Sequence, residues 1–316
     1  MSRKFKLQTM ILCVTLSFAL GWFTPKAFDS WRSTEQSGPQ QAASTAPDAA
    51  PSAAGAAFDA LSRFKAIEWS AEPLSGADEL VPALASNPSL RTAALARFRQ
   101  EPAGVAKNNL AQFLTAQALP EIIAAAAAWA QQADSATARA DGFSLLIRLP
   151  PQPQTYGLAR QAIEQEKDPA ALAAAVWAIH PLGNILDPAE VQRVVPRLHA
   201  LTQHPLPDVR AASIQRLAQW DRADLHTAQD VLRMLSDPVE DGRIAAIGAS
   251  SIASLKSDKI KEKLFNMLVD PKETNELQSI VMMQIGRFGL SAQEYGTYQE
   301  VERKFTKLDE SANPVK

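Results

Sequence analysis

The sequence predicts an all-α fold in which helical hairpins repeat along the chain as an α-solenoid. Two observations lead to this prediction. The chain has 316 residues of which 46% are apolar, enough for a sizeable core, and its 13 glycines are few, as in helical proteins. Prolines also recur at positions 169, 205, 238 and 271, each after an Asp or His and before an amphipathic or alanine-rich segment. A period of about 33 to 36 residues is typical of helical repeats.

Each break has a physical reason to separate two helices. An Asp or Asn side chain can cap the helix that follows, and proline is tolerated in the first turn of that helix but disfavours continuation of the helix before it. The breaks of this form are Asn87-Pro88, Asp168-Pro169, Asp187-Pro188, Asp237-Pro238 and Asp270-Pro271. Asp134-Ser135 is expected to mark another repeat that lacks the proline.

Between the breaks, apolar residues follow the spacing of a helix face. Val191, Val194 and Leu198 belong to one such stripe, and a final helix over 292–308 has its apolar residues at Tyr295 and Tyr298, then Val301 and Phe305. We therefore predict irregular N-terminal repeats over 58–133 and regular repeats over 134–309. The final helix is predicted to cap the array, and residues 310–316 form a tail.

The N-terminus has the layout of a secretory signal or a signal anchor. Residues 1–6 carry Arg3, Lys4 and Lys6, and residues 7–24 are uncharged and mostly apolar. An uncleaved anchor is the favoured interpretation, which places a single span in a bacterial inner membrane and the C-terminal body in the periplasm. Cleavage after Gly21 or Ala27 is the alternative and predicts a soluble periplasmic or secreted protein.

A linker is predicted between the membrane segment and the folded body. Residues 25–57 are rich in Ala, Pro and Ser, and from residue 33 onward they contain almost no large apolar side chain. Such a segment cannot bury enough surface to offset the entropy of ordering it. We therefore expect it to be a disordered tether.

One stretch resembles a known family. Leu206 to Ile214 contains Asp208, Val209 and Arg210, and Asp241-Gly242-Arg243 repeats the pattern 33 residues later. This pattern is similar to the Asp-x-Val-Arg-x-x-Ala core of HEAT repeats. The resemblance implies a right-handed α-solenoid of HEAT-like hairpins in which Asp208, Arg210 and Arg243 belong to a structural ladder of polar contacts between repeats.

The HEAT-like pattern is uneven along the chain. Asn87 to Leu95, with Arg91, is a weaker copy of it. The next arginine after Arg243 would fall at position 276, where the chain has Glu276 instead. The last repeat is therefore expected to depart from the pattern.

Composition and motifs argue against several kinds of chemistry. A net charge of −2 and no run of Lys or Arg in the body make nucleic acid an improbable partner. Cys13 is the single cysteine and lies in the apolar N-terminal segment, so the body can form no disulfide or cysteine-ligated zinc site. The histidines, His180, His199, His204 and His226, form no pair at helical ligand spacing. We predict no catalytic residue, no metal site and no small-molecule cofactor.

Tryptophans are the remaining candidates for recognition. Trp129, Trp177 and Trp220 lie in predicted helices among small or aliphatic residues and are interpreted as wedges between repeats. Trp69 precedes Pro73 in a loop-like segment and is the candidate partner-binding residue. A lid over the exposed core of the first repeat is the role that we favour for Trp69.

Three hypotheses for function follow. The first is a membrane-tethered, non-enzymatic periplasmic scaffold that binds a protein or peptide of the cell envelope along its curved face. The second is a steric chaperone resembling the lipase foldases, which share the anchor, the Ala/Pro-rich tether and the helical body; their Arg-x-x-Phe-Asp-Tyr segment is missing here. The third is a HEAT-like enzyme such as a lyase.

Overall fold

The computed structural model describes residues 77–312, apart from 182–186, 222–224 and 253–254. These residues form fourteen α-helices, α4 to α17, with one short 3-10 helix and no strand among them. The all-α prediction is therefore confirmed. The predicted membrane segment, linker and Trp69 lie outside the described residues.

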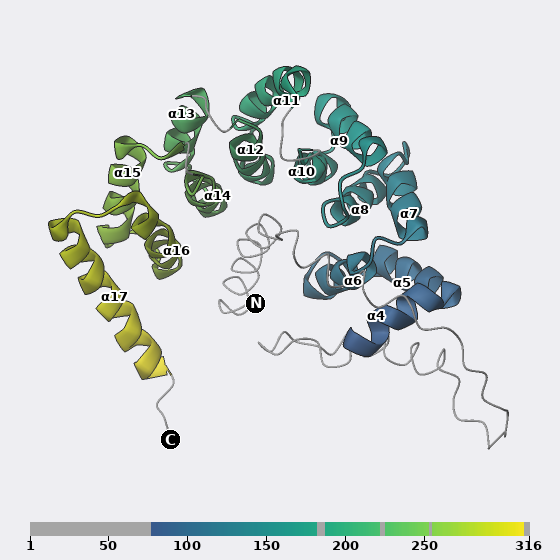
Figure 1. Ribbon diagram of the computed structural model, residues 1–316, viewed down its shortest axis with the longest axis horizontal. Coiled ribbons are helices and arrows are strands. Elements are labelled where there is room, and N and C mark those ends of the chain that lie inside the picture. Colours follow the sequence, from purple (N-terminus) through teal and green to yellow (C-terminus); the bar gives the residue numbers. More distant parts are fainter. Residues whose placement is uncertain (1–76, 182–186, 222–224, 253–254, 313–316) are drawn as a thin grey trace, which may run out of the picture.

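Most of the helices lie in two layers along a curved row (Figure 1). The inner layer consists of α8 (Ala136–Leu146), α10 (Pro169–Ala178), α12 (Pro207–Trp220), α14 (Glu240–Ser250) and α16 (Asn275–Ile285). The outer layer consists of α7 (Pro120–Ala130), α9 (Pro153–Gln165), α11 (Pro188–Leu201), α13 (Leu225–Met234) and α15 (Asp258–Val269). Each inner helix packs against the outer helix that precedes it, and α8, α10, α12 and α14 also pack against the next inner helix. This arrangement is consistent with a helical-repeat solenoid.

The two ends of the row differ from its middle. At the N-terminal end, α4 (Ala77–Ser86), α5 (Pro88–Gln100) and α6 (Val105–Thr115) pack on one another, and α6 continues into the row by contacting α8. At the C-terminal end, the 3-10 helix Gly286–Phe288 leads to α17 (Ala292–Ala312). Tyr298 and Val301 of α17 pack against the core, as expected for a cap. Tyr295 is 52% exposed and stacks on Tyr298.

The sequence explains where many of these helices begin. Asn87, Ser135 and Asp168 cap α5, α8 and α10 by accepting hydrogen bonds from backbone N–H groups three residues later, at 2.9 to 3.1 Å. Asp187 caps α11 by accepting from the backbone N–H of Ala189, two residues later. Proline then occupies the first turn of α5, α10 and α11.

Two of the predicted caps are wrong. Asp237 does not cap α14, which begins after Val239, and Asp270 ends α15 rather than starting α16, whose cap is Thr274. Both carboxylates instead accept a hydrogen bond from the backbone N–H two residues on, at 2.9 Å. At Asp237 and Asp270 this bond closes an Asx-turn ahead of the helix, because the next helices begin only at Glu240 and Asn275.

The core runs along the whole row and depends on close approach of small residues. Ala126 and Ala130 of α7 lie directly against Gly142 of α8, and all three are buried. Trp129 stacks on Phe98 of α5, with ring centroids 6.2 Å apart. In the part of the chain that is described, no helix combines the length and the apolarity needed to cross a bilayer.

Candidate functional site

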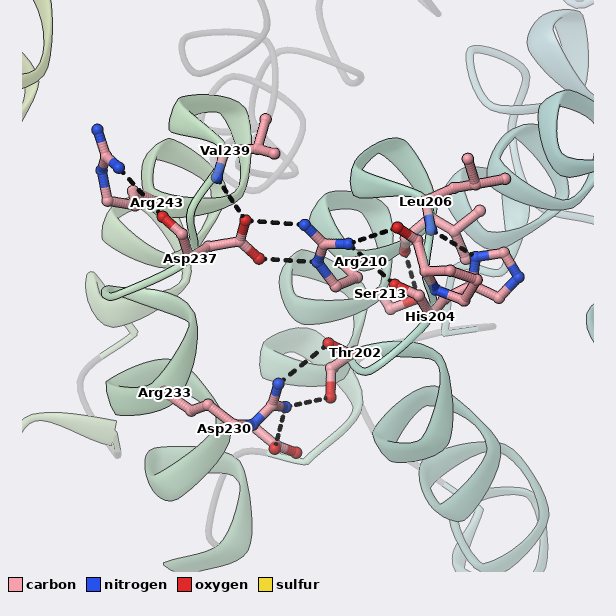
Figure 2. Close-up of polar contacts among 12 residues, drawn as sticks. Thr202, His204, Leu206, Arg210, Ser213, Asp230, Arg233, Asp237, Val239 and Arg243 are labelled. Atoms are coloured by element: carbon pink, nitrogen blue, oxygen red, sulfur yellow. Dashed lines mark hydrogen bonds and ion pairs between the residues drawn. The ribbon is translucent and has the colours of Figure 1, made fainter.

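A polar ladder runs along the edge where the inner helices begin. Its clearest step is Arg210, the fourth residue of α12, whose Nε and Nη2 donate to the two carboxylate oxygens of Asp237 at 2.7 and 2.8 Å (Figure 2). Arg210 Nη1 also donates to the carbonyls of His204 and Pro205, which follow α11. The guanidinium thus contacts both the turn that follows outer helix α11 and the turn that follows the next outer helix, α13. It joins two neighbouring hairpins.

The same arrangement recurs in other hairpins. Arg139 of α8 pairs with Glu166 at 2.6 Å, and its Nη1 donates to the carbonyls of residues 132 and 133 at the end of α7. Arg243 of α14 pairs with Glu273 at 3.3 Å and donates to the carbonyl of Asp237. The partners are 27 and 30 residues apart in sequence, about one repeat.

An N-terminal variant of this contact involves α5. Arg91 pairs with Glu121 at 3.0 Å and donates to the carbonyls of Leu84 and Ala85 at the end of α4. The separation from Glu121 is again 30 residues. The weaker copy of the motif around Arg91 therefore makes the same kind of contact.

Two inner helices lack the arginine. In α16 the fourth residue is Gln278, which donates to the carbonyl of Asp270 at 2.7 Å. The position equivalent to Arg243 is thus 278 rather than 276, because α15 is two residues longer than α13. In α10 the fourth residue is Leu172, which is buried.

The electrostatics of the ladder follow from its ion pairs. Burial by itself raises the pKa of the Asp237 carboxyl, but the hydrogen bonds from Arg210 and from Val239 N outweigh it, and the pKa lies below its usual value. The hydrogen bond from Arg139 likewise lowers the pKa of Glu166. Both carboxylates are therefore charged at neutral pH and hold their arginines in place.

Asp208, Arg210 and Arg243 occupy different places in this ladder. Arg210 and Arg243 are at the centres of their steps. Asp208 is exposed in the first turn of α12, and the carboxylate that contacts Arg210 is Asp237. Sequence reasoning missed Arg139, although it lies in the fourth position after the Ser135 cap, as Arg210 does after Leu206.

A second group of contacts surrounds the C-terminal end of α10. Arg216 of α12 is buried, stacks over the Trp177 ring at 5.2 Å and donates to the Trp177 carbonyl. Trp220 Nε1 donates to the Ile179 carbonyl at 2.8 Å. Trp177 and Trp220 thus bridge α10 and α12, as predicted for wedges between repeats.

The charges in this second group are strongly affected by burial. Burial lowers the pKa of Arg216 to about 9. Burial, with the charge of Arg216, lowers the pKa of His180 to about 3, and His180 Nε2 lies 3.2 Å from the carbonyl of Ile147. His180 is therefore neutral, and it joins α10 to the end of α8.

Histidine also takes part in a bridge on the outer layer. His199 Nδ1 of α11 lies 2.5 Å from Asp230 Oδ2 of α13, and its Nε2 lies 3.9 Å from Asp221. Arg233 contacts Asp230 and donates to the carbonyl of Thr202 at the end of α11. Within the described residues, no group of three or more His, Cys, Asp or Glu side chains could hold a metal ion. The bridge is a contact between outer helices.

A depression of about 300 Å³ lies between α15 and α17, and it is lined by Asp258, Lys261, Glu262, Phe265, Asn266 and Glu294. Lys261 and Glu294 pair across it at 2.7 Å. The Ser250 hydroxyl is buried and donates to the Ile247 carbonyl, so it is held within its own helix.

No protein-family model matches the sequence. No curated protein matches it either. Among solved structures, that of the Escherichia coli protein YibA is similar over 77% of this chain and 79% of its own, with 13% identical residues and a TM-score of 0.46.

Proposed function

We propose that this chain is a HEAT-like, right-handed helical-repeat scaffold that binds a protein or peptide partner and performs no catalysis. The supporting observation is the arginine ladder: the same helix position makes the same contact to a neighbouring hairpin at Arg139, Arg210 and Arg243. Such contacts stiffen a row of hairpins, and a stiff row presents a long surface that is already formed before binding.

The proposal extends to where the scaffold acts. Residues 7–24 anchor it in a bacterial inner membrane, residues 25–57 tether the body, and the body lies in the periplasm, where it meets envelope proteins. The layout of charges and apolar residues at the N-terminus supports this part of the proposal. Trp69, in the segment between tether and described body, stays a candidate contact for the partner.

Photo-crosslinking in cells tests the binding function. A photoreactive amino acid is placed at Gln215, half-exposed on inner helix α12, and in a matched variant at Gln192, exposed on outer helix α11. We expect a discrete adduct with one envelope protein from position 215 and a weaker or absent one from position 192. The absence of any adduct from position 215 would overturn the proposal.

The membrane anchor needs a separate test. Alkaline carbonate extraction of membranes should leave the full chain in the pellet, and a variant lacking residues 7–24 should be released. Release of the full chain under the same conditions would contradict the anchor and favour signal cleavage.

A further inference from the structure

Two adjacent inner helices begin with residues that cannot cap them. Ser135, Asp168 and Thr274 start α8, α10 and α16 with a side-chain oxygen that accepts a backbone N–H. The equivalent residues of α12 and α14 are Leu206 and Val239, and neither makes a side-chain cap. An aliphatic residue is among the poorest choices at this position, so α12 and α14 are less stable than they could be.

The two aliphatic side chains are also in contact with water. Leu206 is 40% exposed and Val239 is 37% exposed, and both project toward the same side of the inner layer (Figure 2). One apolar side chain on a surface is ordinary. Here two of them occupy the N-cap position of consecutive inner helices, where a capping side chain is preferred, so both helices depart from the same local preference. Such departures are expected at functional sites.

Two exposed carboxylates lie close in sequence to these side chains. Asp208 and Asp241 are exposed, each two residues after one of the aliphatic residues. The nearby arginines do not neutralise them, because Arg210 is paired with Asp237 and Arg243 with Glu273. The surface at this edge therefore combines apolar side chains with carboxylates.

We propose that Leu206, Asp208, Val239 and Asp241 form a docking edge for a partner segment in which apolar side chains stand next to Lys or Arg. This rests on the proposed binding function and specifies its site and the chemistry of its partner. Apolar side chains of the segment cover Leu206 and Val239, and its cations face the two aspartates. The same aspartates repel anionic lipid and nucleic acid.

Binding of a defined peptide to the full chain tests the edge. The probe is a fluorescently labelled Gly-Lys-Leu-Lys-Gly-Lys-Leu-Lys-Gly peptide, followed by anisotropy with the protein in a nonionic detergent. One control peptide replaces each Lys with Glu and a second replaces each Leu with Ser. We expect the Lys-Leu peptide to bind at least about tenfold more tightly than either control, because each control removes one of the two complementary features.

The decisive variant removes the proposed site without lowering the stability of the fold. Leu206→Ser with Val239→Ser should weaken peptide binding by about tenfold or more, while the midpoint of thermal unfolding stays equal or rises because serine caps both helices. A matched control, Val269→Ser with Met283→Ser, removes two exposed apolar side chains from α15 and α16 and should leave binding unchanged. Asp208→Asn with Asp241→Asn should weaken binding and reduce its dependence on salt.

The results separate this inference from the function on which it rests. Unchanged peptide binding by the Leu206→Ser, Val239→Ser variant, or equal binding of the Glu peptide, would overturn the docking edge. If that variant still forms the adduct at Gln215 in cells, the docking edge is overturned and the scaffold function stands. If the unmodified chain forms no adduct at all, the scaffold function itself is overturned.

Discussion

Gly142 is the position where the close approach of two helices can be tested most directly. It lies in α8, and a Cβ atom added there would be 2.4 Å from Ala130 N and 2.6 Å from Ala126 O. These are backbone atoms of α7, so no side chain can rotate away to make room. Gly142→Ala therefore forces α7 and α8 apart, and this pair has one of the most extensive contacts in the row.

The size of the effect follows from two opposing contributions. Overpacking at contacts this short costs about 3 kcal/mol. Alanine in place of glycine inside a helix contributes about 1 kcal/mol of stability in the other direction. We therefore expect Gly142→Ala to lower the free energy of unfolding by about 2 kcal/mol. The measurement is urea unfolding followed by far-ultraviolet circular dichroism.

Gly157 provides a matched control. It lies in α9, and an added Cβ atom there would meet nothing within 4 Å. Gly157→Ala should therefore raise the free energy of unfolding by about 1 kcal/mol through helix propensity alone. If Gly142→Ala is as stable as the unmodified chain, or is stabilised like Gly157→Ala, the close packing of α7 on α8 is refuted.

Three further predictions concern the polar contacts. The unfolded chain takes up a proton at His180 as the pH falls below about 6.5, whereas the folded chain does so only near the lowered pKa of about 3, so the free energy of unfolding should decrease as the pH is lowered from 6.5 to 3. Urea unfolding at several pH values should show a weaker pH dependence for His180→Gln than for the unmodified chain. An identical dependence would contradict the prediction. Asp237→Ala leaves the Arg210 guanidinium without its carboxylate and should cost about 3 kcal/mol in the same assay, whereas a loss near zero would show that the pair carries no stability. Arg216→Met removes the donor to the Trp177 carbonyl but also a buried charge, so the net cost should be only about 1 kcal/mol, and a loss as large as that of Asp237→Ala would refute this reasoning.

The sequence was most informative where local chemistry decides the outcome. Asn87, Asp168 and Asp187 could be recognised as caps because each precedes a proline that fits the first turn of a helix. The prediction of caps from the same dipeptide at Asp237-Pro238 and Asp270-Pro271 was wrong, because a carboxylate in an Asx-turn and a carboxylate at a cap have the same sequence signature. Only the length of the following turn separates the two cases, and that length is set by packing.

The ladder could be predicted only in part for a related reason. The arginines follow a motif, so Arg210 and Arg243 could be named from the sequence. Their partners follow none: Asp237 lies 27 residues after Arg210 and Glu273 lies 30 residues after Arg243. The separation differs because α15 is two residues longer than α13 and because Glu273 lies one position later in the turn that follows its helix. The substitution of Gln278 for arginine was missed because α15, two residues longer than α13, shifts the period.

Helix α10 lacks the ladder arginine at its first turn but makes polar contacts to its neighbours at its last turn. Leu172 replaces the arginine at the start of α10, where alanines pack the helix closely between α8 and α12. At the end of α10, Arg216 and Trp220 of α12 donate to its last carbonyls, and His180 reaches the carbonyl of Ile147 in α8. The negative end of the α10 dipole faces the Arg216 guanidinium, which explains how a buried cation persists although none of these partners is an anion. Every inner helix from α8 to α14 is thus joined to its neighbours by polar contacts, at its first turn or at its last.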